Sequence, residues 1–278
     1  MRLGGPLLES YSDPGEWVSL VKKYGYSAAY CPVGLDADTR TIHSYQNQAR
    51  KNDIVIAEVG AWSNPLSPDG QERKRALEKC IKSLALADEI NARCCVNISG
   101  SRGRRWDGPH PENLTRQTFE AIVEVVRKII DAVKPKNTFY TLETMPWMYP
   151  DSVASYQALL KAVDRKSFAV HFDPVNLINS PSRYYQNRKI IQDFVRKLGC
   201  HIRSCHAKDT ILLSELTVHL KETRPGCGYL DYGAFLQELN SLDPDTPLML
   251  EHLSQQEEYQ KAASFIREKA AENNILFQ

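Results

Sequence analysis

The sequence predicts a (β/α)₈ barrel (a TIM barrel), and three observations lead to that fold class. β-like runs and helical patterns alternate along the whole chain, which is typical of parallel strands joined by crossover helices. The alternation repeats eight times within 278 residues, the usual size of such a barrel. No Gly-x-Gly-x-x-Gly turn follows the first strand, so an open dinucleotide-binding sheet is less favoured. No linker or shift in composition divides the chain, and we expect one domain over residues 1–278.

The eight predicted strands are short apolar runs bounded by turn-forming residues. They cover residues 2–8, 27–33, 53–62, 94–101, 139–145, 168–174, 202–209 and 247–253. The seventh is followed by a long segment, 210–230, which we expect to be an irregular loop that acts as a lid or as a subunit contact.

A predicted helix follows each strand. The helices are expected at 12–25, 36–51, 69–91, within 111–134, at 150–164, near 186–198, near 230–239 and at 255–274. In the first, Ser12 is the expected N-cap, Pro14 lies in the first turn and Gly25 ends the helix. The third has apolar residues at helical spacing, including Ala76, Leu84 and Ile90.

The composition excludes several classes of protein. Lys and Arg number 35 against 34 Asp and Glu, a net charge of +1 that argues against a broad nucleic-acid surface. No apolar run is long enough to cross a membrane, and the first residues do not form a signal peptide. The seven cysteines are scattered without a Cys-x-x-Cys pair, so a disulfide framework or a zinc knuckle is not expected. We expect a cytoplasmic protein that binds neither nucleic acid nor membrane.

Four predicted strands each end in a side chain that commonly binds metal. The runs TLETMPW (141–147), VHFDPVN (170–176), RSCHAKD (203–209) and PLMLEHL (247–253) supply Glu143, Asp173, His206 and Glu251. These are strands five to eight of the predicted barrel, and active sites of this fold lie where the carboxyl ends of neighbouring strands converge.

A shared metal site is the best interpretation of these four ends. Alone, Asp173 could cap a helix, and Glu143 or Glu251 could be an ordinary loop charge. Together, three carboxylates at one place repel one another unless a cation lies between them. Three carboxylates and one imidazole suit Mn²⁺, Mg²⁺ or Co²⁺ better than an ion that prefers thiolates.

These segments resemble the xylose isomerase-like barrel superfamily, the sugar isomerase/epimerase group that also contains endonuclease-type repair enzymes. The resemblance is carried by LETMPW, HFDPVN, CHAKD with the later RPGCGYLDY, and LMLEH, and it covers essentially the whole chain. It implies one divalent cation, with Mn²⁺ preferred and Mg²⁺, Co²⁺ or Zn²⁺ as alternatives, held by Glu143, Asp173, His206 and Glu251. In the ketose 3-epimerase branch, the equivalents of Glu143 and Glu251 also carry protons on opposite faces of the sugar, and the resemblance implies that role here.

The chain departs from the epimerase pattern at three places. Asn176 stands where the epimerases have a histidine, and Met-Tyr-Pro (148–150) stands where they have a further glutamate. Residues 211–213 are Ile-Leu-Leu where an arginine is expected, and Arg224 is a candidate to replace it from another position. These departures keep the metal chemistry and disfavour 3-epimerisation of a free ketose.

The predicted chemistry is proton abstraction beside a carbonyl. A cation on a ketone oxygen acidifies the adjacent C–H, and a carboxylate within hydrogen-bond reach removes the proton to give an ene-diolate. Return of the proton to the other face is epimerisation, its return to the neighbouring carbon is isomerisation, and loss of a β-substituent is elimination. The sequence leaves all three open, so a lyase that cleaves keto-sugar glycosides is the closest alternative.

Further side chains are expected around the substrate, a sugar or sugar derivative. The candidates are Trp62, Trp147, His171, Asn176, Lys208 and Arg224. Trp147 could form a flat wall for a sugar face or only pack. Lys208 shares a strand face with His206, so it could hold a substrate hydroxyl or phosphate or pair with the carboxylates. For His171 we prefer a supporting hydrogen bond beside the site over direct ligation.

Two segments are expected near the opening of the barrel. Glu58 and Trp62 end the third predicted strand and are expected to line it, and the basic loop 99–108 could cradle a polar substrate or be a solvated charge run.

Two other classes of function are weighed. An endonuclease would need several histidines for a zinc cluster, but the chain has only seven, and His43, His201 and His219 lie away from the predicted strand ends. A non-catalytic binding protein is disfavoured because an unused cluster of carboxylates is costly to bury. A homo-oligomer remains an open expectation.

Overall fold

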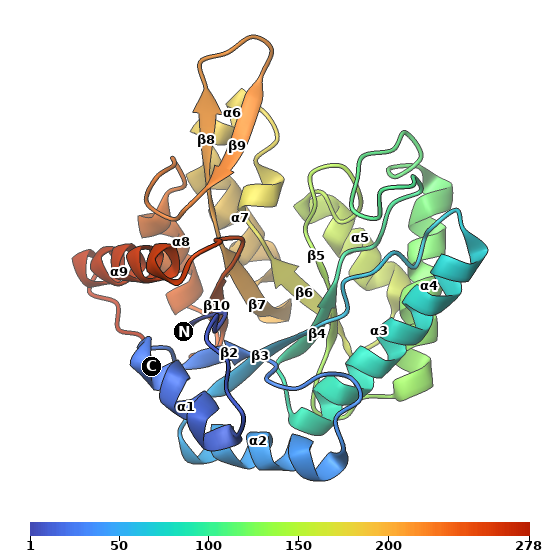
Figure 1. Cartoon of the computed structure of the whole chain (residues 1–278). Helices are drawn as coiled ribbons and strands as arrows, with labels where there is room; N and C mark the ends of the chain where they lie inside the picture. Colours follow the sequence, from blue (N-terminus) through green and yellow to red (C-terminus); the bar gives the residue numbers. More distant parts are fainter.

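In the computed structural model, which describes residues 1–278, eight parallel strands close into a barrel, so the predicted fold class is confirmed (Figure 1). The strands follow one another around the barrel in chain order, and the last pairs with the first. They are β1 (Arg2–Gly5), β2 (Ala28–Tyr30), β3 (Val55–Gly60), β4 (Cys94–Asn97), β5 (Tyr140–Glu143), β6 (Phe168–Phe172), β7 (Ile202–Ala207) and β10 (Pro247–Leu250). Because β5, β6, β7 and β10 are successive neighbours, their carboxyl ends meet on one side of the barrel opening.

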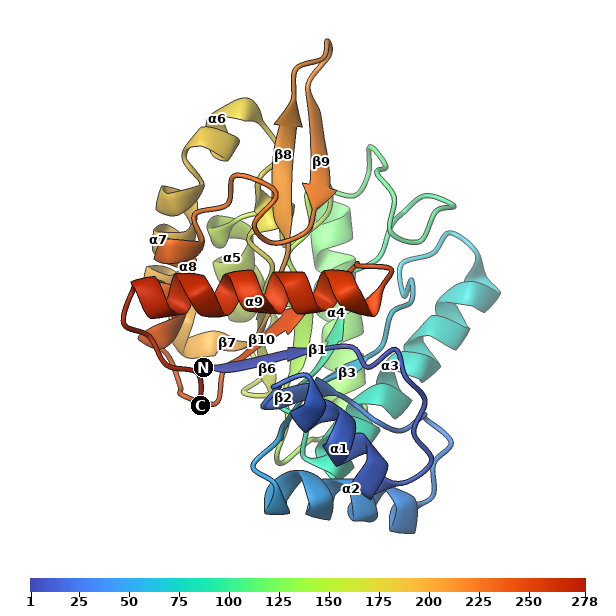
Figure 2. The same cartoon turned by 60° about the vertical axis from the view of Figure 1, so that its left-hand side comes forward.

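Helices surround the barrel and cover its outer face (Figures 1 and 2). The main ones are α1 (Pro14–Lys23), α2 (Thr39–Lys51), α3 (Gly70–Ile90), α4 (Arg116–Val133), α5 (Val153–Val163), α7 (Asn187–Leu198), α8 (Tyr232–Asn240) and α9 (Gln256–Glu272). The short additional turns are α6 (Pro181–Tyr185), η1 (Val175–Leu177) and η2 (Gly199–His201). The strands and helices enclose an apolar core of 60 buried residues. None of the helices combines the length and apolar composition that crossing a bilayer requires.

The N-cap predicted for the first helix is wrong. Asp13, not Ser12, caps α1, and its carboxylate accepts the backbone N–H groups of Gly15 at 2.7 Å and Glu16 at 2.9 Å. The longer carboxylate reaches two free N–H groups of the first turn, which a serine hydroxyl one residue earlier cannot do. Ser12 instead donates from its hydroxyl to the side chain of Glu16.

A β-hairpin replaces the irregular loop that was predicted after the seventh strand. β8 (Asp209–Leu213) pairs antiparallel with β9 (His219–Thr223), and the pair rises from the barrel opening (Figures 1 and 2). The barrel strand therefore ends at Ala207, and Asp209 belongs to the hairpin rather than to β7. Thr210 to Leu213 is itself an apolar, partly β-branched run, and it forms strand outside the barrel because it finds a partner in β9.

The Asp209 carboxylate anchors the base of this hairpin. It accepts the backbone N–H groups of Thr210 at 2.8 Å, Gly226 and Gly228 at 3.0 Å, and Leu230 at 2.9 Å. Gly226 has a φ of +89°, and a Cβ on Gly228 would overlap with Asp209 and the Thr210 carbonyl. The spacing of His-x-Lys-Asp and Pro-Gly-x-Gly therefore has a structural cause: the aspartate needs a backbone that approaches it closely.

Replacing Asp209 with Ala is expected to destabilise the protein by about 2–4 kcal/mol, because four backbone N–H groups lose their acceptor. Urea unfolding measures the loss. Asp131→Ala, which removes an exposed ion pair with Arg165, is the control and should cost less than about 1 kcal/mol. Equal losses in the two variants would contradict the anchoring role.

Candidate active site

The structure brings Glu143, Asp173, His206 and Glu251 together. Glu143 ends β5, Asp173 follows β6, His206 lies in β7 and Glu251 follows β10. One ligand atom from each residue lies within 4.8 Å of those of the other three. Three of the side chains are buried and Glu251 is nearly so. The geometry that the four strand ends predict is therefore present.

His206 and Lys208 bring positive charge to the carboxylates. Nδ1 of His206 lies 3.0 Å from Oε1 of Glu143 and 2.9 Å from Oε1 of Glu251. Nζ of Lys208 lies 2.6 Å from Oδ2 of Asp173 and 2.7 Å from Oε1 of Glu251. Lys208 is only 2% exposed, so the ammonium group is directed into the cluster. Of the two interpretations of Lys208, the structure shows the pairing with the carboxylates.

These contacts divide the carboxylates into two kinds. Burial opposes the ionisation of Glu143 and Glu251, but the charges of His206 and Lys208 outweigh it and hold both pKa values below the ordinary one. Burial, reinforced by the charges of Glu143 and Glu251, instead raises the pKa of Asp173 to about 7. Glu143 and Glu251 are therefore ionised in this cluster. Additional positive charge would lower the pKa of Asp173 and so favour its anion as well.

The donor set fits a divalent cation. Oδ2 of Asp173 and Oε1 of Glu251 are buried and have no hydrogen bond of regular geometry, although the Lys208 ammonium lies close to both. Carboxylate oxygens and one imidazole nitrogen are ligands that Mg²⁺, Mn²⁺ and Zn²⁺ accept. A cation that bound these two oxygens would need the space that the Lys208 ammonium occupies.

Asp173 takes the capping role that the sequence left open, and one of its oxygens remains for the other role. Its Oδ1 accepts the backbone N–H groups of Val175 at 2.9 Å and Asn176 at 3.3 Å, which begins the turn after β6. Its Oδ2 remains for Lys208 or a cation. Asn176, which stands where the epimerases have a histidine, donates from Nδ2 to Oε1 of Glu143 at 3.2 Å and so helps to orient that carboxylate.

A cavity of about 630 Å³ lies over the cluster. Trp62, Trp106 and Trp147 stand around it, while Glu143, His206, Lys208 and Glu251 contribute polar groups. Trp147 is 39% exposed and donates from Nε1 to the carbonyl of Asp107 at 2.8 Å, which ties it to the basic loop 99–108. Aromatic walls around a few convergent polar groups are common in sites for small ligands.

Two candidates, Arg224 and Glu58, lie elsewhere than the sequence suggested. Arg224 pairs through Nε with Oε2 of Glu258 at 2.9 Å and does not line the cavity, so it does not replace the missing arginine. Glu58 is buried and bonds to His171 instead of lining the opening. His171 makes a supporting hydrogen bond, as preferred for it above, and it does not line the cavity. Both point into the barrel beneath the cavity, so direct contact of either with substrate is not supported.

Among the cavity residues that the sequence interpretation missed are two titratable ones that contact each other, Glu222 and His252. Nδ1 of His252 lies 3.0 Å from Oε1 of Glu222, whose other oxygen lies 3.7 Å from the ammonium of Lys208. His252 could have been noticed because it follows Glu251 directly. Glu222 could not, because it reaches the cavity through β9 of a hairpin that was not predicted.

The comparisons with known proteins agree with this geometry. Residues 18–269 match the family described as xylose isomerase-like TIM barrel. The chain belongs to this family. No curated protein sequence matches the chain significantly.

Solved structures of the xylose isomerase-like fold superpose on almost the whole chain. D-psicose 3-epimerase with D-tagatose from Clostridium cellulolyticum H10 is 16% identical, with a TM-score of 0.67 over 96% of this chain and 99% of that one. A xylose isomerase-like TIM barrel protein from Mycobacterium smegmatis in complex with magnesium is 14% identical, with a TM-score of 0.65 over 94% and 90%. 3-Keto-D-glucoside 4-epimerase from E. coli is 11% identical, with a TM-score of 0.65 over 96% and 99%. At these identities the likeness establishes the fold.

His206→Ala is expected to lower the bound metal content and the melting temperature together, because a cation that binds the folded state stabilises it. Elemental analysis and thermal melts in Mn²⁺ and in EDTA measure the two effects. Arg224→Ala, outside the cluster, is the control. An unchanged metal stoichiometry in His206→Ala would remove His206 from the ligand set.

Proposed function

We propose that the protein is a divalent-metal-dependent sugar isomerase or epimerase that moves a proton beside a carbonyl group. One observation carries this proposal: Glu143 and Glu251 approach the same atom, Nδ1 of His206, at 3.0 and 2.9 Å on the floor of a cavity with tryptophans around it. A substrate in that cavity would have a carboxylate on either side of its reacting carbon.

The cation would be held by Glu143, Asp173, His206 and Glu251. Mn²⁺ is our first choice, with Mg²⁺, Co²⁺ and Zn²⁺ as alternatives, and the bound ion would polarise a carbonyl and its neighbouring hydroxyl. The M. smegmatis relative is in complex with magnesium, which supports a hard divalent ion here as well.

The two glutamates are the proposed proton carriers. Their pKa values lie below the ordinary one, despite burial, because His206 and Lys208 are close, so both are ionised and able to accept a proton. One would remove the proton next to the carbonyl to leave an ene-diolate, and the other would return a proton to the opposite face. Trp62 and Trp147 would flank the sugar, and Asn176 would keep Glu143 oriented through its 3.2 Å hydrogen bond.

The named relatives support a carbonyl sugar as the substrate class. Two of them are epimerases, one crystallised with D-tagatose and one that acts on a 3-keto-D-glucoside. With Asn176 in place of the epimerase histidine and Arg224 paired to Glu258, we favour a keto-sugar derivative over a free ketose.

The second candidate is a lyase that cleaves a keto-sugar glycoside by elimination. The cavity favours it, because about 630 Å³ leaves room for a leaving group beside one sugar ring, and Ile98 and Met145 add apolar surface there. An endonuclease fits less well, because the two groups of metal-type side chains hold only two histidines, and the net charge is +1.

We further infer that the chain works as one domain in the cytoplasm. The four proposed ligands are spread over 109 positions of one barrel (143 to 251), and all seven cysteines are free, as expected in a reducing compartment. A homo-oligomer remains a prediction, with the hairpin of β8 and β9 as the candidate contact or lid, since its tip exposes Leu216 and Val218.

The proposed function is tested by incubating the Mn²⁺-loaded protein with ketoses and with 3-keto-glycosides in D₂O. The expected result is deuterium at the carbon next to the carbonyl, found by NMR and mass spectrometry, and absent after treatment with EDTA. Epimer, isomer or released aglycone in the product separates the two candidates. No exchange and no product with either substrate class would contradict both.

A further inference from the structure

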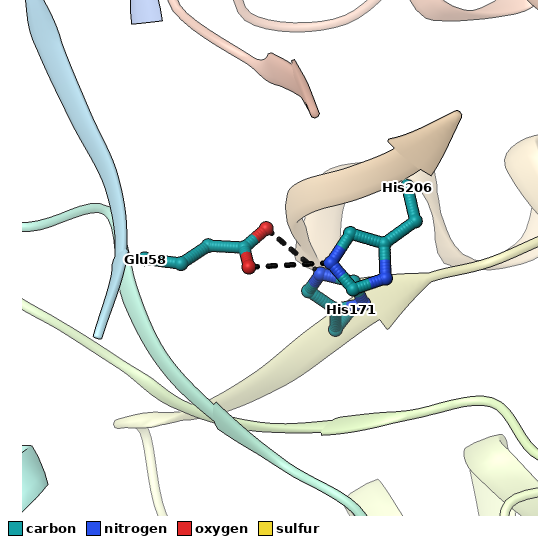
Figure 3. A group of neighbouring side chains, drawn as sticks. All are labelled: Glu58, His171 and His206. Atoms are coloured by element: carbon teal, nitrogen blue, oxygen red, sulfur yellow. Dashed lines mark hydrogen bonds and ion pairs between the residues drawn. The ribbon is translucent and has the colours of Figure 1, made fainter. Parts of the chain in front are cut away.

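Beneath the cavity, the carboxylate of Glu58 faces two histidine rings that lie against each other (Figure 3). Glu58 belongs to β3, His171 to β6 and His206 to β7. Their side chains are at most 1% exposed. None of the steps proposed above uses Glu58 or His171, so this buried charged group needs another explanation.

Both oxygens of Glu58 are engaged. Oε1 accepts from Nε2 of His171 at 2.9 Å and from the hydroxyl of Ser204, while Oε2 faces Nε2 of His206 at 3.3 Å (Figure 3). The two imidazole rings meet edge to face, with centroids 4.2 Å apart. The carboxylate is thus bound from two neighbouring strands and fixes the orientation of both rings.

The contacts of Glu58 determine which ring nitrogens carry hydrogen. Oε1 accepts the hydroxyl hydrogen of Ser204, and each oxygen faces an imidazole nitrogen, so the group acts as an acceptor on every side. An ionised carboxylate only accepts hydrogen bonds, so each Nε2 that faces it must be an N–H donor. For His206, Nδ1 is then the nitrogen left to face Glu143 and Glu251 at 3.0 and 2.9 Å.

We propose that Glu58 is the positioning residue of the metal site: it holds the Nε2–H of His206 and so presents Nδ1 to the cation. His171 and Ser204 bind the carboxylate and keep it in place. A histidine ligand whose second nitrogen donates to a carboxylate is fixed in orientation and is a more basic ligand. The inference rests on the cation site of the proposed function, and it adds a residue that does not itself touch the cation or the substrate.

The same three side chains could be read as a second cation site, since their ligand atoms also lie within 4.8 Å of one another. A cation there would need both Nε2 atoms without hydrogen. The contacts of 2.9 and 3.3 Å and the Ser204 hydroxyl on Oε1 are those of a hydrogen-bonded carboxylate. The number of ions bound per chain distinguishes the two interpretations.

Glu58→Gln tests the inference while it keeps the side chain's size. The amide oxygen can accept from one Nε2–H, but the amide NH₂ then faces the other, so one ring loses its acceptor. We expect Mn²⁺ affinity, measured by calorimetry without substrate, to fall about 10–100-fold. In ¹⁵N-histidine-labelled protein, the wild type should show exchange-protected Nε2–H signals from His171 and His206 that the variant loses or shifts. Thr141→Val, which removes another buried barrel hydrogen bond, is the control and should change neither result.

The outcomes separate this inference from the proposed function. Wild-type Mn²⁺ affinity in Glu58→Gln, unchanged Nε2–H signals, or two ions per chain would each overturn the positioning role. Sugar turnover by the wild type together with unchanged affinity in Glu58→Gln would leave the proposed function standing without the inference. Glu58-dependent Mn²⁺ binding in a protein that exchanges no substrate C–H would support the inference and contradict the proposed function.

Discussion

Glu143→Gln and Glu251→Gln are each expected to lower turnover by about 10²- to 10⁴-fold, the usual contribution of a positioned acid or base. Glutamine keeps the size of the side chain and one oxygen that can act as a ligand, but it cannot accept the substrate proton. Both variants should therefore still bind some Mn²⁺. Steady-state rates at saturating metal, with calorimetry for the metal itself, separate the loss of the base from the loss of the ligand.

Solvent exchange gives the sharper comparison. Each variant keeps one carboxylate, so one of them should still introduce deuterium into the substrate from the face it has retained, without completing the reaction. Glu258→Gln, whose carboxylate pairs with Arg224 outside the cavity, is the control. Near-normal turnover in both site variants would leave the glutamates as ligands only and would favour elimination over epimerisation.

Lys208→Met is expected to make the metal-free protein less stable and the metal-bound protein easier to form. The ammonium lies 2.6 Å from Asp173 and 2.7 Å from Glu251, and removing one partner of a buried ion pair costs about 3–5 kcal/mol. In EDTA the melting temperature should fall by roughly 10 °C. Mn²⁺ affinity should rise, because the cation no longer has to displace the ammonium from the same oxygens.

Thermal melts across a Mn²⁺ titration test both parts of this prediction. The two proteins should differ most in EDTA and converge as the metal saturates the site, since binding to the folded state stabilises it. Lys197→Met, which removes an exposed ion pair with Asp193, is the matched control. A Lys208→Met variant as stable as the wild type in EDTA, or one that binds Mn²⁺ more weakly, would show that Lys208 does not compete with the cation.

The clustering of the four side chains could be predicted from the sequence because it depends only on where each barrel strand ends. In a parallel barrel, residues at the carboxyl ends of adjacent strands must lie near one another, so Glu143, Asp173, His206 and Glu251 needed only correct strand assignments. Glu58 was harder to place. Its partners lie 113 and 148 positions away, and whether it faces the opening or the barrel interior depends on the stagger of the strands.

The segment after β7 was mispredicted for a different reason. Its course is set by the Asp209 carboxylate, which gathers backbone N–H groups from Gly226 to Leu230, and by the pairing of β8 with β9. These are contacts between residues up to 21 positions apart, which local patterns do not reveal. The hairpin places Glu222, in β9, at the cavity and directs Arg224, just after β9, to Glu258. Which of these two side chains reaches the cavity could therefore not be predicted from their spacing in the sequence.

The positions of the tryptophans should make intrinsic fluorescence sensitive to ligand binding in the cavity. Of the four tryptophans, Trp62, Trp106 and Trp147 line the cavity, and only Trp17 is buried elsewhere, against Tyr45. Three of the four indole rings therefore lie where a bound sugar would shield them from water. Intrinsic fluorescence, without any label, should follow ligand binding in unreactive variants such as Glu143→Gln, and iodide should quench the free protein more strongly than the complex.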